Sequence, residues 1–225
     1  MPSPQDDLDL VWQPSLLAAQ EEPSIDRGFE GLQHVDLDQD SWVEHLPGWV
    51  RGSDVLFEDV LETRGWAQRS RHMYDQRVRE PRLTAPWSAA SGERLEPPIL
   101  EEIRVTLSEH YEREFDSVGF NLYRNGRDSV AWHGDRIPRE IEAPIVCLVS
   151  LGEPRRFLLR PKGGGPSRAF MLGRGDLLVT GGNTQRTWDH SVPKVKQAGP
   201  RISLAYRHGM RGDEYRHKRV EEGVV

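Results

Sequence analysis

Three side chains that lie far apart in the sequence are of the types that bind a transition metal. His133 and Asp135 are two positions apart, and His190 follows much later in the chain. Side chains at alternate positions lie on the same face of an extended strand, so the first two can point at one ion. Two histidines and one carboxylate form the facial set that binds iron(II) and leaves coordination positions open. The pattern therefore predicts a non-haem iron site.

A second group of side chains could hold an anion beside that ion. Arg201 and Arg207 stand six positions apart in a β-type run, which places both on one strand face. A guanidinium binds a carboxylate through two parallel hydrogen bonds. Asn121 and Tyr123 share one face of an earlier run and can donate to carboxylate oxygens. These four residues predict a binding site for a dicarboxylate.

A His-x-Asp spacing alone is weak evidence, because the chain has eight histidines and many aspartates. Its ordinary explanation is a surface turn with a hydrogen-bonded histidine. The order of the other parts favours the metal site, since His190 lies in the extended run 188–193 and Arg201 begins the next β-type run. We therefore expect these residues to face one cavity.

The elements that must position this site change in character along the chain. Residues 41–50 have β character, whereas 53 to about 65 and 97–111 carry apolar residues at helical spacing. From residue 115 onward, short β runs alternate with Gly, Pro and Asp, at 118–124, 130–133, 145–151, 156–159, 167–172, 177–180, 187–192 and 202–207. This order predicts a mainly β fold with flanking helices (α+β), built as a sandwich or jelly roll.

Length and composition indicate one soluble domain. The chain has 225 residues, of which 36% are hydrophobic and 29% are charged. We find no apolar run near the roughly 18 residues that a membrane span needs, and the acidic N-terminus lacks the order of a signal peptide. The single cysteine, Cys147, excludes a disulfide within the chain and favours a reducing, cytoplasmic location. We expect Cys147 to be buried and the protein to be a monomer.

The net charge of -6 is unevenly distributed. Residues 1–62 carry fifteen acidic residues and two arginines, whereas 64–82 carry six arginines and two acidic residues. A second basic segment, 155–168, flanks three consecutive glycines. Local charge decides where a phosphate backbone binds, so the acidic total does not exclude nucleic acid.

The ordered motifs along the chain identify a family. They are Asn121-Leu122-Tyr123, His133-Gly134-Asp135, Ser150-Leu151-Gly152, Gly175-Asp176-Leu177-Leu178, His190-Ser191-Val192-Pro193 and the run from Arg201 to Arg207. Over roughly residues 40–208 the chain resembles the AlkB family of iron(II)- and 2-oxoglutarate-dependent nucleic-acid dealkylases. The resemblance implies a double-stranded β-helix, which is a cupin-like jelly roll. It also implies iron(II), 2-oxoglutarate and O2 as cofactor and co-substrates.

The resemblance also implies roles for individual residues. His133, Asp135 and His190 would be the catalytic iron ligands. Asn121, Tyr123, Arg201 and Arg207 would bind 2-oxoglutarate, and Ser203 stands where the family often has asparagine. Ile137 replaces an acidic residue that repair members often carry near the extruded base, which affects the preference among damaged bases. The implied reaction oxidises an N-alkyl group on a base, which is then restored by loss of an aldehyde.

The resemblance also implies a domain organisation with a nucleotide-recognition lid. An acidic, loosely held arm (1–30) would precede the dioxygenase domain (31–208), which contains the lid (65–90) and the β core (115–208), and a charged tail (209–225) would follow. A base inside a duplex must be extruded to reach a buried metal. Trp87, and then Tyr74, are the aromatic candidates for stacking on it, and the lid arginines Arg77, Arg79 and Arg82 are the phosphate candidates. Core packing and a solvated charged face are the ordinary alternatives for these residues.

Three functions remain open from the sequence. The first is oxidative removal of N-alkyl groups from bases in DNA, with RNA as a second nucleic-acid substrate. The second keeps the oxygenase chemistry but acts on a protein or a small molecule, which Ile137 and the acidic total charge favour. The third is a non-catalytic nucleic-acid-binding jelly roll, which would have no need for three metal ligands and two carboxylate-binding arginines.

Overall fold

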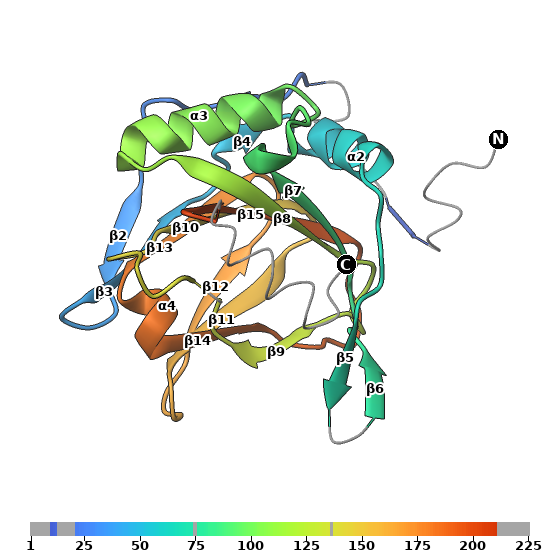
Figure 1. The fold of residues 1–225 in the computed structure, drawn as a ribbon. Coiled ribbons are helices and arrows are strands. Elements are labelled where there is room, and N and C mark those ends of the chain that lie inside the picture. The colour runs from blue at the N-terminus through green and yellow to red at the C-terminus, as the bar shows by residue number, and fades with distance from the viewer. Residues whose placement is uncertain (1–9, 13–20, 74–75, 136, 211–225) are drawn as a thin grey trace.

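Two antiparallel sheets form the body of the protein, in a computed structural model that describes residues 10–12, 21–73, 76–135 and 137–210. The larger sheet has seven strands in the order β2-β3-β13-β10-β15-β8-β7, and the smaller sheet has four in the order β12-β11-β14-β9. The strands of the larger sheet are β2 (Gln33–Asp36), β3 (Ser41–Leu46), β7 (Leu83–Ser88), β8 (Phe115–Tyr123), β10 (Val146–Gly152), β13 (Asp176–Gly182) and β15 (Arg201–His208). Those of the smaller sheet are β9 (Val130–His133), β11 (Arg155–Pro161), β12 (Arg168–Leu172) and β14 (Trp188–Val192). The two sheets lie as separate layers with the two longer helices on one side (Figure 1).

Each strand of the larger sheet sends alternate side chains to two different environments. On β8, Phe120 and Leu122 belong to the core under the helices, whereas Tyr123 belongs to the core between the sheets. Phe120 and Leu122 therefore lie on the strand face opposite Tyr123. The inner face of the larger sheet is therefore the surface on which a site between the sheets is built.

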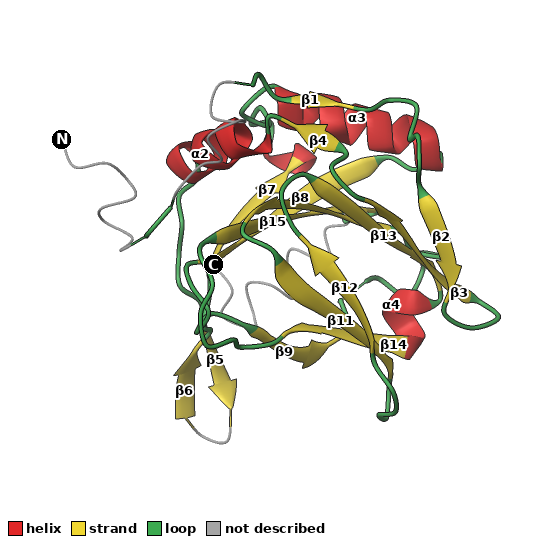
Figure 2. Ribbon diagram, turned by 180° about the vertical axis from the view of Figure 1, so that it is seen from behind, coloured by secondary structure: helices red, strands yellow, loops and turns green. Residues whose placement is uncertain are grey.

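Two helices cover the outer face of the larger sheet, as both views show (Figures 1 and 2). They are α2 (Ser53–Thr63) and α3 (Ile99–Tyr111). Their apolar positions recur at helical spacing, and Leu56 and Val60 on α2 and Leu100 and Ile103 on α3 are fully buried. This packing fixes the curvature of the larger sheet from outside and leaves its inner face for polar groups.

The remaining elements are small. β1 (Ser24–Ile25) pairs with β4 (Val50–Arg51), and β5 (Ser70–Met73) pairs with β6 (Gln76–Arg79) in a hairpin that projects from the body (Figure 1). The short helices are η1 (Ala89–Ser91) and α4 (Thr184–Thr187). No helix in the described ranges is long and apolar enough to cross a membrane.

The eight predicted β runs after residue 115 are all strands, and both predicted helices are present. Cys147 is fully buried, as expected. The prediction of a loosely held arm over 1–30 stays a prediction. Within its described residues, Trp12 is 9% exposed and packs on Phe57 with ring centroids 4.2 Å apart, and β1 is hydrogen-bonded to β4. These contacts join the described parts of the acidic segment to the core. The predicted tail lies outside the described residues apart from its first two, Gly209 and Met210.

Candidate active site

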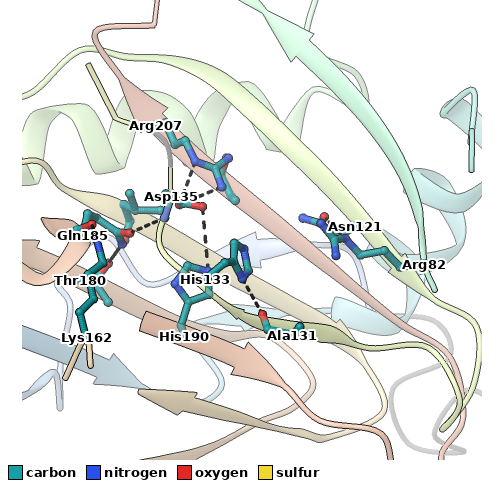
Figure 3. A network of polar contacts seen from close by, with 12 residues as sticks. Arg82, Asn121, Ala131, His133, Asp135, Lys162, Thr180, Gln185, His190 and Arg207 are labelled. Carbon is teal, nitrogen blue, oxygen red and sulfur yellow. Dashed lines mark hydrogen bonds and ion pairs between the residues drawn. The ribbon is translucent and has the colours of Figure 1, made fainter. Parts of the chain in front are cut away.

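The predicted metal ligands meet where β9 ends beside the middle of β14 in the smaller sheet (Figure 3). His133, the last residue of β9, is paired in register with His190 on β14. Asp135 was predicted to share a strand with His133, but β9 ends at His133 and Asp135 lies in the turn that follows. The three predicted ligands do come together, but strand alternation does not explain how Asp135 reaches the site.

A β-bulge sets the direction of His133. Along β14, two steps separate His190 from Val192, whereas three steps separate their partners His133 and Val130 on β9. The extra residue breaks strict alternation, because a bulge places two residues of one strand opposite one of its partner. The carbonyl of Ala131, within the bulge, accepts a hydrogen bond of 2.8 Å from His133 Nδ1. With Nδ1 protonated, His133 Nε2 keeps its lone pair for a metal.

The three side chains are close enough to share one ion. One ligand atom from each of His133, Asp135 and His190 lies within 4.8 Å of the others. His190 Nε2 is 4.0 Å from Asp135 Oδ1, and the two imidazole centroids are 4.3 Å apart at an interplanar angle of 54°. This donor set fits iron(II), for which two neutral imidazoles and one carboxylate are the expected ligands.

Burial and the neighbouring charges hold Asp135 and His190 in their metal-binding forms. Burial opposes ionisation of Asp135, but the charges of Arg207, His190 and His133 outweigh it, and the pKa of this carboxyl lies below its usual range. Burial lowers the pKa of His190 to about 4, against the attraction of Asp135. At neutral pH the site therefore presents an ionised carboxylate and a neutral His190 imidazole.

A second polar site lies deeper between the sheets, around Arg201. This side chain is 1% exposed, and its Nε donates to Ser150 Oγ at 2.8 Å. Its NH1 and NH2 have no hydrogen-bond partner among the described residues, although both are buried. A buried donor without a partner costs about 1–3 kcal/mol, so such a group calls for a ligand. Burial lowers the pKa of Arg201 to about 10, which leaves it charged at neutral pH.

The residues around Arg201 match the predicted dicarboxylate site. Tyr123 pairs with Arg201 in register, and its ring centroid lies 5.4 Å from the guanidinium carbon. Ser203 is paired with Asn121 on one side and Ser150 on the other, so the three form a polar row across the inner face. The structure thus brings together every residue predicted to bind the dicarboxylate except Arg207. The two free nitrogens of Arg201 suit one carboxylate of 2-oxoglutarate.

Arg207 instead pairs with a metal ligand. Its Nε and NH2 lie 3.0 and 2.9 Å from Asp135 Oδ2. Gly119 on β8, which pairs with Ala205, leaves room for this side chain, because a Cβ there would lie 3.0 Å from Arg207 NH1. Arg207, which was predicted to bind a carboxylate of 2-oxoglutarate, is therefore paired with Asp135 of the protein itself.

The predicted base-stacking role of Trp87 is corrected by the structure. Trp87 is 7% exposed, donates from Nε1 to the carbonyl of Glu93, and belongs to the core under the helices. It pairs with Val118, so it faces away from the sheet surface that carries Asn121. Alternation along a strand of six residues, with a buried residue such as Thr84 on its other face, does not reveal which face meets the site.

The predicted lid residues have different outcomes. Arg82 is only 11% exposed in its side chain and contacts Asn121 Oδ1 at 3.0 Å and Glu80 at 3.3 Å, so it points into the cavity instead of outward. Arg79 is exposed on β6. Tyr74 lies outside the described residues, and only the backbone of Arg77 is described. Ile137 is half-buried against the core between the sheets. Substrate contact by Tyr74, Arg77, Arg79 and Ile137 stays a prediction.

Several residues of the site were missed from the sequence. Ser150 orients Arg201, and Arg155, which is 2% exposed, donates to the carbonyls of Asn125, Asp128 and Pro193 beside Tyr123. Gln185 on α4 receives a hydrogen bond from the backbone of Asp135. These partners are many positions apart in the chain, and of them only Ser150 stood in a recognised motif.

Comparisons with known proteins decide the family. A family model described as the 2OG-Fe(II) oxygenase superfamily matches residues 43–220. Human alpha-ketoglutarate-dependent dioxygenase alkB homolog 3 is 32% identical over 206 residues, which cover 81% of this chain and 71% of that protein. The chain belongs to the AlkB family of 2OG-Fe(II) oxygenases. This confirms the predicted 2-oxoglutarate-dependent dioxygenase, with iron(II), 2-oxoglutarate and O2.

Other relatives of this AlkB-family chain agree. The Arabidopsis thaliana DNA oxidative demethylase ALKBH2 is 33% identical over 135 residues, which cover 49% of this chain and 43% of that protein. The solved structure of OsALKBH1 is similar in fold, with a TM-score of 0.55 and 16% identity over 79% of this chain and 99% of that one. That likeness supports the fold and confirms the predicted jelly roll.

Proposed function

We propose that this protein removes N-alkyl groups from damaged bases in DNA by oxidation. The observation that carries the oxygenase chemistry is the buried Arg201, whose two unpaired nitrogens face the same inter-sheet space as the metal triad. DNA is supported as the substrate by relatives named as DNA oxidative demethylases. RNA is a second nucleic-acid substrate within the same proposal.

The residues of the chain divide the work of holding the reactants. His133, Asp135 and His190 would bind iron(II), and Arg201, with Tyr123 and the row Asn121, Ser203 and Ser150, would bind 2-oxoglutarate. When bound, iron(II) with 2-oxoglutarate and O2 supplies the oxidation of a C–H bond on the N-alkyl group, with succinate and carbon dioxide as coproducts. Arg207 keeps Asp135 ionised and oriented.

The projecting β5–β6 hairpin and Arg79 are proposed to contact the nucleic-acid backbone. The triad lies between the sheets, so a base in a duplex must leave the stack to reach it. Contacts to phosphate make binding depend on salt, with a slope that falls as contacts are removed. Replacing Arg77 and Arg79 together with alanine is expected to weaken oligonucleotide binding and to flatten this slope. An unchanged slope would show that these charges belong only to a solvated surface.

The test of the proposal is a panel of singly methylated oligonucleotides, both single- and double-stranded, in DNA and RNA. The protein with iron(II), 2-oxoglutarate and oxygen is expected to restore the base and to release formaldehyde and succinate in equal amounts. The matched control is His133→Ala, which removes one metal ligand and should abolish turnover. Retained turnover in this variant, or succinate formation that ignores every nucleic acid in the panel, would contradict the proposal.

A monomeric state and a cytoplasmic location complete the proposal. The single cysteine, Cys147, is fully buried, which is compatible with a reducing compartment. Light scattering after gel filtration is expected to give the mass of one chain, 25.8 kDa. Cell fractionation is expected to find the protein with cytoplasmic markers.

A further inference from the structure

Gln185 reaches from α4 to the turn that carries the metal-binding carboxylate (Figure 3). Its Oε1 accepts a hydrogen bond from the backbone N–H of Asp135 at 3.4 Å. Because β9 ends at His133, Asp135 lies beyond the strand ladder, and the bond to Gln185 supports its backbone from another element. Gln185 is 5% exposed, so water does not readily replace it as the acceptor.

The orientation of the Gln185 amide is determined from both ends. Its Nε2 donates to Thr180 Oγ1 at 2.8 Å, and Thr180 Oγ1 donates in turn to the carbonyl of Val146 at 3.3 Å. A hydroxyl has one proton, so Thr180 must accept from Gln185. The amide NH2 therefore faces Thr180 and the amide oxygen faces Asp135. A chain of three hydrogen bonds thus links the metal-ligand turn to two strands of the larger sheet.

The glycine between the two ligands packs against α4 and a lysine. Lys162, just after β11, places Nζ 3.4 Å from the backbone carbonyl oxygen of Gln185. A Cβ on Gly134 would lie 3.1 Å from Lys162 Nζ and 3.2 Å from the same carbonyl oxygen. The segment between His133 and Asp135 therefore packs closely against this bonded pair, which explains a glycine at position 134.

The same short segment also delivers His190. α4 leads directly into β14, so Gln185 and the ligand His190 are five positions apart on one continuous stretch. A shift of α4 would move His190 through the chain and Asp135 through the hydrogen bond. From this connection we infer that Gln185 is a positioning residue that sets the metal site by holding the backbone of Asp135 against α4. The inference rests on the proposed function, because it concerns the same metal.

The experiment measures binding of manganese(II) to the metal-free protein by the electron paramagnetic resonance of the free ion, without 2-oxoglutarate, oxygen chemistry or nucleic acid. Gln185→Leu removes both amide contacts at similar volume and is expected to bind manganese(II) about 10- to 100-fold more weakly. The thermal midpoint of its metal-free form is measured in parallel and is expected to stay within a few degrees of the unmodified protein. The control Gln197→Leu changes an exposed glutamine and should bind as the unmodified protein does.

Thr180→Val, which keeps the side-chain shape and removes the far anchor of the amide, keeps the inference testable if Gln185→Leu does not fold. It is expected to weaken manganese(II) binding less, in the same direction. The double variant should bind no more weakly than Gln185→Leu alone, because both changes break one chain of contacts.

Manganese(II) affinity within twofold of the unmodified protein in Gln185→Leu, or in Thr180→Val if the first variant is unfolded, would overturn the inference. Additive losses in the double variant would overturn it as well. Failure of the unmodified protein to bind manganese(II) would instead count against the proposed function, so the two failures are distinguishable.

Discussion

Two arginines on β15 show how one strand face can serve two purposes. Arg201 and Arg207 face the same inter-sheet space, and both side chains are largely buried. Arg207 is neutralised by Asp135, whereas Arg201 donates from Nε to a neutral serine, and its other two nitrogens have no partner in the part of the chain that the structure describes. One arginine therefore has its counter-charge within the protein, and the other is arranged to bind an anion. The comparison can be tested by removing each side chain in turn.

The largest effect is expected for 2-oxoglutarate binding by Arg201→Met. A charge-assisted hydrogen bond contributes about 1.5–3 kcal/mol, and this variant loses two of them to the co-substrate. The 2-oxoglutarate concentration for half-maximal succinate formation should rise roughly 100-fold or more. Arg201→Lys, which keeps the charge but loses the planar fork, should recover only part of this loss. An unchanged 2-oxoglutarate dependence in Arg201→Met would mean that the carboxylate binds elsewhere.

Opposite changes in stability are expected for the two arginines in the metal-free protein. Arg201→Met removes a buried cation with unpaired donors and should raise the thermal midpoint, by about 2–4 °C for each kcal/mol gained in a domain of this size. Arg207→Met leaves the Asp135 carboxylate without its partner and should lower the midpoint by several degrees. Differential scanning calorimetry of both metal-free variants measures the two thermal midpoints. Shifts of the same sign would remove the distinction between the two residues.

A smaller effect is expected when the support of Arg201 is removed. Ser150→Ala takes away the acceptor that orients Arg201 Nε. The guanidinium stays in place but is less well fixed, so the half-maximal 2-oxoglutarate concentration should rise roughly 10-fold, as for loss of about one hydrogen bond to a charged group. The affinity for manganese(II) should not change, because Ser150 does not contact the triad. A loss confined to metal binding would contradict this assignment.

The smallest effect concerns His208, which follows Arg207 on the same strand. Burial, with help from the charge of Arg113, lowers the pKa of His208 below its usual value, and its Nε2 accepts a hydrogen bond from the backbone of Ile145 at 3.0 Å. The unfolded chain therefore binds a proton on His208 more readily than the folded protein does. The contribution of His208 to the free energy of unfolding is fully present above about pH 6.5 and is lost as the pH falls below that value. Urea unfolding between pH 5 and 8 should show a flatter profile for His208→Gln, which accepts the same bond without titrating. An equal slope in the two proteins would exclude His208 as a source of the pH dependence.

The sequence predicted the strands and the ligands well where the signal is local. The eight β runs were found because apolar residues and turn residues alternate at short range, and the metal ligands were found because their motifs keep their order. The face of Trp87 was not found, since Thr84 on the other face of β7 is buried just as Leu83 and Ala85 are. The sequence indicated that β7 exists but contained no signal for which side of it meets the cavity.

The supporting contacts of the site were beyond sequence reasoning for a different reason. Gln185 is fifty positions from Asp135, and Arg82 is 39 positions from Asn121. Such pairs depend on how two sheets and a helix meet, and no spacing rule connects them. Arg82 was expected outside because arginines are usually solvated, but Asn121 and Glu80 supply partners inside the cavity.

The extra residue in β9 affects how the smaller sheet holds the metal site. Val130 and His133 are three positions apart on β9, whereas their partners Val192 and His190 are two positions apart on β14. With this bulge, Val130 packs against the core between the sheets and His133 still joins the triad. Deleting Ala131 would leave two steps on each strand and remove the carbonyl that accepts the hydrogen bond from His133 Nδ1, so the imidazole would lose the contact that orients it. A single-codon deletion there, far smaller than the loss of a domain, is expected to weaken the binding of iron while His133 stays on the inner side of the smaller sheet.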